Sequence, residues 1–214
     1  MPARQNPVVI VFARAPQPGA VKTRLIPLLG ADGSAALHAK LVERTLGTAR
    51  AASFGRVELH CAPDMTDPFF RFCAGHYGVV LREQAGGDLG ARMLHAFESA
   101  LVDHRRVLLV GSDCPALTAR HLRQAERALR DGADAVFVPC EDGGYALIGL
   151  NRAEPRLFDG MAWGSDVVMA ETRTRLSALG RHWRELETLW DIDRPADYQR
   201  LMAPGPLDIR RTPA

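Results

Sequence analysis

Six consecutive apolar residues near the start of the chain, Val8 to Ala13, open into a loop that contains two prolines and a glycine. A run dominated by β-branched residues is typical of a buried strand in a parallel sheet, and the prolines prevent the strand from continuing. The loop region carries three cations before the first acidic residue, namely Arg14, Lys22 and Arg24. Open α/β sheets bind ligands at the carboxyl ends of their strands. We therefore expect this loop to bind an anion such as phosphate, the alternative being an ordinary solvated basic loop.

Along the rest of the chain, apolar strand-like runs alternate with helix-like stretches, which predicts βα units around a mostly parallel sheet. The predicted strands cover residues 8–13, 56–61, 78–82, 106–110, 133–139, 145–150 and 184–186. The predicted helices cover residues 32–52, 67–74, 89–101, 118–130, 166–179 and 195–201. We expect one α/β domain over residues 1–203 and a mobile C-terminal tail over residues 204–214, starting at Pro204-Gly205-Pro206.

Composition excludes several classes of protein. A net charge of +2 over 214 residues argues against an extended nucleic-acid surface. The four cysteines form no CxxC pair, which fits neither a zinc site nor a disulfide framework, so we expect reduced thiols in a cytoplasmic protein. No stretch is apolar enough for a signal peptide or a membrane span.

Carboxylates are predicted to meet the basic loop at the same edge of the sheet. Asp113 comes directly after the buried strand that ends at Val110, and Asp193 lies in the segment Asp191-Ile192-Asp193. Two oxygen donors from distant segments suit Mg²⁺ or Mn²⁺ when substrate phosphates fill the other positions. Taken singly, Asp113 also fits a turn residue and Asp193 a helix cap.

Two glycine-rich segments complete the set of candidate motifs. Asp142-Gly143-Gly144-Tyr145 leads into a strand and lets the backbone approach a ligand closely, although an ordinary turn explains it equally well. The segment from Gln84 to Met93 leads into a helix N-terminus that suits a base, ribose or phosphate, while Asp88 taken alone fits a helix cap. The seven histidines, His38 among them, show no metal-ligand spacing and are expected to be surface or core residues.

Together these segments resemble the bacterial proteins called transferase 1, rSAM/selenodomain-associated, which are similar to arsenosugar biosynthesis glycosyltransferases. The resemblance runs from about Val8 to Leu201 through FARAPQPGAVKTRL, GDLGARM, LLVGSDCPAL, EDGGYALIGL and DIDRPADY. It implies the GT-A-type fold of the nucleotide-diphospho-sugar transferases, which is a three-layer αβα sandwich with a mostly parallel, Rossmann-like sheet. Nucleotidyltransferases of cofactor and sugar-acid synthesis belong to the same superfamily.

The resemblance also implies roles for particular residues. Arg14, Lys22 and Arg24 would contact the phosphates, and Asp113 and Asp193 would bind the metal. The base and ribose fall near Gly87, Asp88 and Arg92. The acceptor would face Asp142, Gly143, Gly144 and Tyr145, with Trp163 as a lid or stacking residue. The chain departs from glycosyltransferases of this fold in one respect, because Asp113 is followed by Cys114 and Pro115 instead of completing a DxD motif.

The leading hypothesis is a divalent-metal-dependent glycosyltransferase that uses a nucleotide-sugar donor and a small-molecule acceptor. The metal, Lys22 and Arg24 would stabilise the leaving diphosphate beside Asp113, and Asp142 would orient or deprotonate an acceptor hydroxyl. Two alternatives stay open. One is a nucleotidyltransferase that joins an NTP to a small phosphorylated acceptor and releases pyrophosphate, and the other is a nucleotide-binding module without turnover. The sequence leaves the oligomeric state open, a homodimer included.

Overall fold

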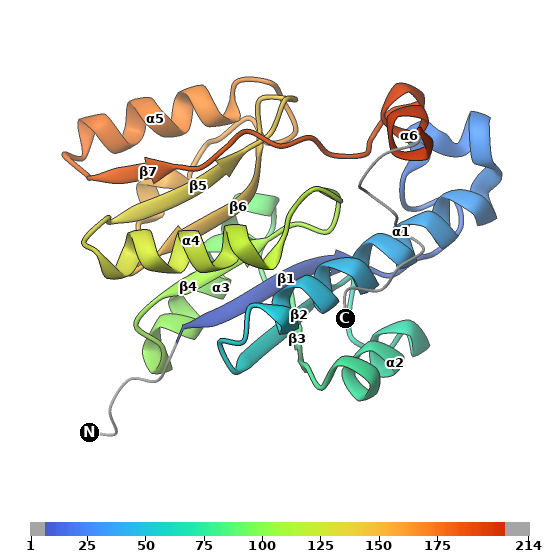
Figure 1. Cartoon of the computed structure of the whole chain (residues 1–214), viewed down its shortest axis with the longest axis horizontal. Coiled ribbons are helices and arrows are strands. Elements are labelled where there is room, and N and C mark those ends of the chain that lie inside the picture. Colours follow the sequence, from blue (N-terminus) through green and yellow to red (C-terminus); the bar gives the residue numbers. More distant parts are fainter. Residues whose placement is uncertain (1–6, 204–214) are drawn as a thin grey trace.

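The computed structural model describes residues 7–203 (Figure 1). The predicted tail at 204–214 lies outside the described residues. A single seven-stranded sheet, in the order β3-β2-β1-β4-β6-β5-β7, forms the centre of the molecule. Its strands are β1 (Val8–Arg14), β2 (Arg56–Ala62), β3 (Val80–Glu83), β4 (Val107–Val110), β5 (Ala135–Pro139), β6 (Tyr145–Leu150) and β7 (Trp183–Glu185). Only β6 runs antiparallel to its neighbours, β4 and β5.

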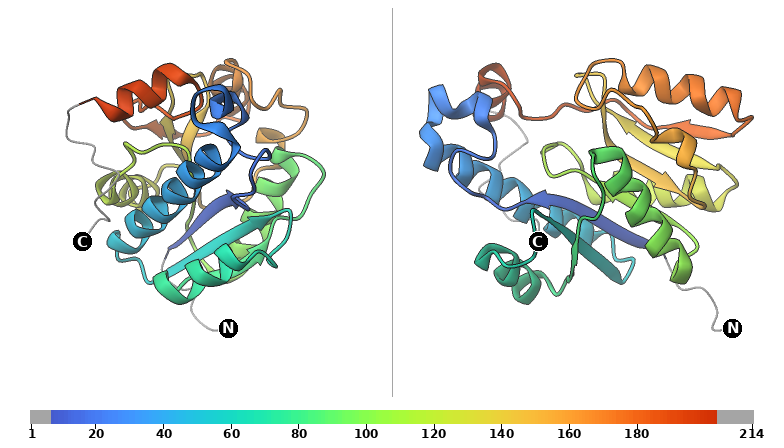
Figure 2. Two further views of the ribbon diagram at one scale, coloured as in Figure 1. Left: turned by 90° about the vertical axis from the view of Figure 1, so that its right-hand side faces the viewer. Right: turned by 180° about the vertical axis from the view of Figure 1, so that it is seen from behind.

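Helices cover both faces of the sheet. They are α1 (Ile26–Ala51), α2 (Pro68–Tyr77), α3 (Leu89–Asp103), α4 (Ala119–Arg130), α5 (Val168–Ala178) and α6 (Pro195–Met202), with short 3₁₀ turns η1 (Thr23–Leu25) and η2 (Pro155–Leu157). Helices α1 and α4 lie in front of the sheet in Figure 1, and the right-hand view of Figure 2 shows α3 on the opposite face. The predicted three-layer αβα sandwich with a mostly parallel sheet is therefore confirmed.

Alternation along β1 explains why the strand is apolar throughout. Val9 and Val11 belong to the core cluster on one face of the sheet, where α1, α2 and α4 contribute residues. Ile10 and Phe12 belong to the cluster on the other face, to which α3 and α5 contribute. A strand that is covered on both sides has no solvated face, so it has no place for alternating polar residues.

Helix α1 begins six residues before its predicted start at Asp32. Pro27 occupies its first turn, where a proline costs no hydrogen bond, and Gly30 breaks the regular backbone with φ 72° and ψ 169°. The apolar pattern of the sequence reveals only the longer piece that follows this kink. The piece before it follows η1 directly, and its Leu29 packs against the core cluster that contains Leu25, Trp190 and Ile192.

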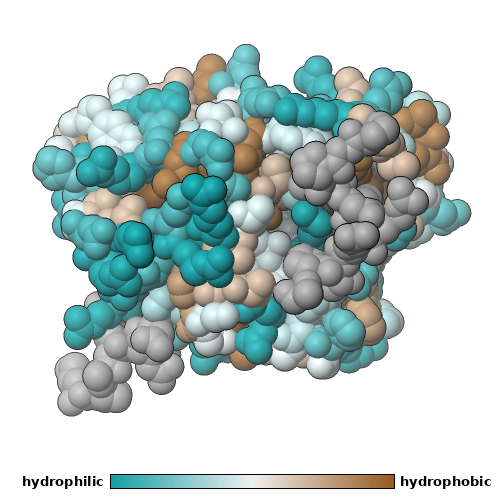
Figure 3. Space-filling view, viewed as in Figure 1, coloured by the Kyte–Doolittle hydropathy of each residue, from teal (hydrophilic) through white to brown (hydrophobic). Residues whose placement is uncertain are grey.

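Figure 3 shows many hydrophilic residues on the left-hand part of the visible face, over α4, with apolar residues in separate patches among them. The arginines of α4 contribute to this polarity, since Arg120, Arg123, Arg127 and Arg130 are all exposed. Among residues 7–203, no helix has the length and apolar character needed to cross a bilayer.

A buried carboxylate on β2 makes stability depend on pH. Burial raises the pKa of Glu58, but hydrogen bonds from His60 (3.1 Å) and Arg56 (2.7 Å) outweigh that effect and lower the pKa to about 2. A carboxyl pKa below its unfolded value stabilises the fold above about pH 4.5, and this contribution, up to about 3 kcal/mol, is lost as the pH falls toward 2. Urea unfolding between pH 6 and pH 3 should show this loss in the wild type and a flatter profile in Glu58→Gln. Glu98→Gln, on the exposed side of α3, is the matched control and should keep the wild-type profile.

Candidate active site

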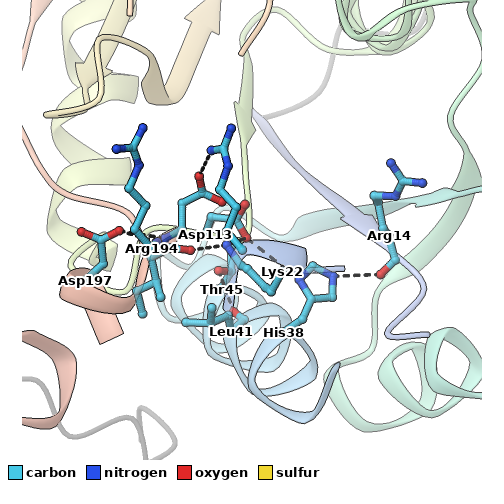
Figure 4. A network of polar contacts seen from close by, with 11 residues as sticks. Arg14, Lys22, His38, Leu41, Thr45, Asp113, Arg194 and Asp197 are labelled. Carbon is cyan, nitrogen blue, oxygen red and sulfur yellow. Dashed lines mark hydrogen bonds and ion pairs between the residues drawn. The ribbon is translucent and has the colours of Figure 1, made fainter. Parts of the chain in front are cut away.

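The loop after β1 and the loop after β4 meet through an ion pair at the carboxyl edge of the sheet. Lys22 Nζ lies 2.9 Å from Asp113 Oδ1, and it also donates to the backbone carbonyl of Ile192 (Figure 4). The Lys22 side chain is 4% exposed, although the residue stands in a loop. Its backbone has φ 48°, in the left-handed region that non-glycine residues rarely adopt. This conformation turns the side chain inward, and the basic loop is thereby joined to the predicted metal-binding carboxylate.

His38 of α1, a buried residue as the sequence allows, lies beside this pair. Its Nε2 lies 3.0 Å from the carbonyl oxygen of Arg14, and its Nδ1 lies 4.0 Å from Asp113 Oδ1 (Figure 4). Because a carbonyl can only accept, Nε2 carries the proton and Nδ1 presents a lone pair. Burial lowers the pKa of His38, although the charge of Asp113 opposes this, so the ring is neutral at neutral pH.

The other two predicted phosphate contacts lie at the surface. Arg14 is the last residue of β1, and its side chain is exposed. Arg24 forms an exposed ion pair with Asp193. The backbone N–H groups of Asp193 and Arg194 both donate to Asp197, which fixes the start of α6. The structure thus places Asp193 against Arg24, just before the N-terminus of α6.

A pocket of about 310 Å³ lies beside the Lys22–Asp113 pair. Its lining includes three carboxylates, from Asp113, Asp142 and Asp191. The lining also includes aromatic and apolar side chains, namely Phe12, Leu89, Met93, Leu109, Tyr145, Trp163 and Val168. Trp163 stands at right angles to Tyr145, with 6.4 Å between the ring centroids. One cavity therefore offers both charge and a flat hydrophobic surface.

Asp191, not Asp193, is the carboxylate of its segment that lines this pocket. An extended stretch places it there, because Leu189 pairs with Cys140 and the N–H of Ile192 donates to the carbonyl of Asp113 (2.9 Å). Burial, followed by the neighbouring charge of Asp142, raises the pKa of Asp191 to about 6. The sequence analysis identified the pair Asp191 and Asp193 but assigned the metal to Asp193.

The turn between β5 and β6 is fixed by close backbone packing. Asp142 Oδ1 accepts a hydrogen bond from the N–H of Gly144 (2.9 Å), and the carbonyl of Gly143 accepts one from the N–H of Met169 (2.8 Å). Gly143 has φ 88°, and a Cβ there would lie 2.0 Å from the carbonyl oxygen of Asp166. Asp142, Gly144 and Tyr145 line the pocket, whereas Gly143 lies behind its wall and packs against the next loop.

The glycine-rich approach to α3 supplies only part of the pocket. Asp88 accepts a hydrogen bond from the N–H of Ala91 (2.8 Å), so the prediction that it caps a helix is confirmed. Arg92 Nε donates to the carbonyl of Gly86 at 3.2 Å. Leu89 and Met93 reach the pocket, but its described lining does not include Gly87, Asp88 or Arg92.

No group of three or more His, Cys, Asp or Glu side chains in the described part of the chain is arranged to hold a metal ion. The carboxylates of the pocket lining, Asp113, Asp142 and Asp191, are the candidate oxygen donors. Asp113 Oδ1 is buried and has no hydrogen bond of good geometry despite its ion pair with Lys22, and His38 Nδ1 facing it is likewise without one. Two carboxylates and a set of substrate phosphates are a donor set that Mg²⁺ accepts.

Comparison with known proteins gives a consistent result. The family described as an uncharacterized protein conserved in bacteria (DUF2064) matches residues 45–165. A crystal structure from Desulfovibrio desulfuricans G20, provisionally named a nucleotide-diphospho-sugar transferase, is 30% identical, with 97% of this chain and 91% of that chain covered and a TM-score of 0.86. No curated protein matches the sequence.

More distant solved structures share the fold alone. A nucleotidyl transferase from Methanothermobacter thermautotrophicus is 15% identical, with 91% of this chain and 95% of that chain covered and a TM-score of 0.62. The 4-diphosphocytidyl-2C-methyl-D-erythritol synthase of Anaerococcus prevotii DSM 20548 is 12% identical, with 92% and 96% covered and a TM-score of 0.60. The chain therefore belongs to the DUF2064 family and has the fold of the nucleotide-diphospho-sugar transferases.

Proposed function

We propose that this protein is a divalent-metal-dependent transferase that takes a nucleotide-sugar donor and passes the sugar to a small acceptor. The observation that carries the proposal is the Lys22–Asp113 pair at the edge of a pocket that is lined both by three carboxylates and by aromatic rings. Cations at a strand end suit a diphosphate, and a sugar ring packs well against an aromatic face. The name of the Desulfovibrio relative supports the same class of donor.

We propose Asp113 and Asp191 as the protein ligands of a Mg²⁺ or Mn²⁺ ion. Both line the pocket, whereas Asp193, the ligand expected from sequence, is paired with Arg24. A bound divalent cation would supply charge that neutralises the diphosphate as it leaves. Asp191→Asn and Asp193→Asn, compared at increasing Mn²⁺ concentration, separate the two assignments, because only loss of a true ligand raises the Mn²⁺ requirement of turnover.

The remaining residues of the site have separate proposed roles. Lys22, Arg14 and Arg24 hold phosphate oxygens, and Arg24 releases Asp193 when it does so. Asp142 is exposed at the mouth of the pocket and accepts the proton of an acceptor hydroxyl. Trp163 and Tyr145 orient the transferred group.

The test is a product analysis with Mg²⁺ or Mn²⁺ and a panel of nucleotide sugars and NTPs. Release of nucleoside diphosphate from a nucleotide sugar supports glycosyl transfer, and slow transfer to water makes this measurable before the acceptor is identified. Release of pyrophosphate from an NTP in the presence of phosphorylated sugars would instead establish a nucleotidyltransferase. That second candidate is favoured by one observation, since Asp113 is followed by Cys114 and Pro115 and so lacks the second carboxylate of a DxD motif. If nucleotides raise the melting temperature but no substrate in the panel is turned over, the protein is a nucleotide-binding module.

Nucleotide affinity should depend on Lys22. Lys22→Met is expected to weaken nucleoside diphosphate binding about tenfold to a hundredfold, because a charge-assisted contact to phosphate contributes about 1.5 to 3 kcal/mol. Titration calorimetry with a nucleoside diphosphate measures the effect. Lys40, on the exposed side of α1, is the only other lysine, and Lys40→Met should bind as the wild type does. Equal affinity of the two variants would remove Lys22 from the phosphate site.

A further inference from the structure

Two of the four cysteines lie in the wall of the pocket, and the proposed transfer reaction uses neither. Cys114 follows Asp113 in the loop after β4, and Cys140 begins the turn after β5. Both line the pocket, and they are 5% and 8% exposed. Both belong to the same core cluster, and each thiol lies close enough to the other to affect its pKa. The pair comes from two segments 26 residues apart that the sheet brings together, so its closeness is a product of the fold.

The other two cysteines form an internal comparison. Cys61 of β2 and Cys73 of α2 are also close enough to interact electrostatically, and they belong to the same core cluster, but both are 0% exposed. Neither lines the pocket. The chain thus contains one thiol pair sealed in the core and one that a small solute reaches through a pocket of about 310 Å³. That volume is several times the roughly 30 Å³ share of one water molecule in the liquid.

We propose that Cys114 and Cys140 form a modification site, at which a hydroperoxide converts the two thiols into an intramolecular disulfide across the wall of the pocket. The Cys114 sulfur attacks the outer oxygen of the hydroperoxide, the O–O bond breaks, and an alcohol leaves (water, when the oxidant is hydrogen peroxide), which gives a sulfenic acid. Cys140 then attacks the sulfenic sulfur, the S–S bond forms, and water leaves with the thiol proton. Two thiols lose two electrons in all, and the hydroperoxide gains them. The bond that forms between the two sulfurs is about 2.05 Å long.

The disulfide would join two segments that carry opposite parts of the site. Asp113 is the residue before Cys114, and Asp142 is two residues after Cys140. Asp191, whose electrostatic partners include both thiols, lies between these segments. Drawing the two sulfurs to bonding distance would shift Asp113 and Asp142 relative to one another, and the proposed transfer reaction requires a fixed arrangement of these carboxylates. Oxidation is therefore expected to lower turnover at least tenfold, reversibly, an effect that rests on the proposed function.

The experiment treats the full chain with hydrogen peroxide, then blocks remaining thiols under denaturing conditions and maps peptides by mass spectrometry. The expected result is a linked pair of peptides that contain Cys114 and Cys140, with free thiols falling from four to two per chain and recovering on reduction. Cys73→Ala should form the same link, because its thiol lies in the core. In Cys140→Ala no intramolecular link should form. Treatment with a reductant should therefore restore turnover in the oxidised wild type by breaking the disulfide, but not in this variant.

Three results would overturn the proposal: four free thiols after oxidation, a link between Cys61 and Cys73, or linkage only between separate chains. Because the readout is a covalent bond, it does not depend on any transferase assay, so failure of the proposed function leaves this test intact. A disulfide that forms without changing turnover would keep the modification site and overturn its inhibitory effect. If Cys140→Ala fails to fold, the wild-type peptide map still decides the question.

Discussion

Asp113→Asn is expected to reduce kcat about 100-fold to 1000-fold while the protein stays folded. The substitution keeps the shape of the side chain but removes the charge that would hold a divalent cation and that pairs with Lys22. Loss of one preorganised electrostatic contact to a developing charge has an effect of this size in other enzymes. Steady-state turnover of the nucleotide substrate identified by product analysis, at saturating Mn²⁺, is the measurement.

The control separates loss of chemistry from loss of stability. Asp113→Asn leaves the buried Lys22 ammonium without its carboxylate, and an unpaired buried charge destabilises a fold. The double variant Lys22→Met, Asp113→Asn removes this penalty, so it should regain stability without regaining turnover. Asp103→Asn, on an exposed residue at the end of α3, should behave as the wild type. Turnover that survives in Asp113→Asn would exclude this carboxylate from the reaction.

Gly143→Ala should destabilise the protein by about 3 kcal/mol or more, for two reasons that add. A non-glycine residue at φ 88° carries a steric penalty of about 1 to 2 kcal/mol, and a Cβ placed 2.0 Å from the carbonyl oxygen of Asp166 forces the backbone apart. For a chain of this length we expect the melting temperature to fall by about 6 to 12 °C. Differential scanning calorimetry measures it directly.

The adjacent glycine provides the comparison for that prediction. Gly144 lacks a positive φ, and its Cβ would meet only the Asp142 carboxylate, at 3.2 Å. Gly144→Ala should therefore change stability by about 1 kcal/mol or less, although it narrows the pocket. Equal melting temperatures for the two variants would mean that the turn rearranges and that its packing against Asp166 contributes little.

The fold was predictable where periodicity alone decides. Tyr145–Leu150 matches its predicted strand at both ends, because an apolar run bounded by a glycine pair leaves one solution. The antiparallel direction of that strand was not predicted, since direction depends on how the chain connects through space and not on the run itself. The first turn of α1 was missed because its pattern is interrupted at Gly30.

The site was predictable only to the level of the sheet edge. Strand ends indicated that Lys22 and Asp113 lie close together, and the ion pair between them agrees with that reasoning. The positions of His38 and Asp191 in the site could not be predicted from the sequence. They depend on the rotation of α1 about its axis and on the path of an extended segment without regular structure. The contact between Cys114 and Cys140 was hidden for the same reason. Spacing along the chain carries no information about pairs that meet only after a crossover.

The reversed strand β6 has a consequence for how such a pocket can be altered. Parallel neighbours in a sheet must be joined by a crossover, which ties the length of the connection to the packing of a helix. β5 and β6 are joined instead by a short hairpin turn, residues 140–144, in which Cys140, Asp142 and Gly144 line the pocket. Replacing Asp142 within this turn, with Gly143 and the Glu141–Arg200 ion pair retained, would reshape one side of the cavity while every helix keeps its place. The hairpin is thus the natural position at which to redesign what the protein accepts.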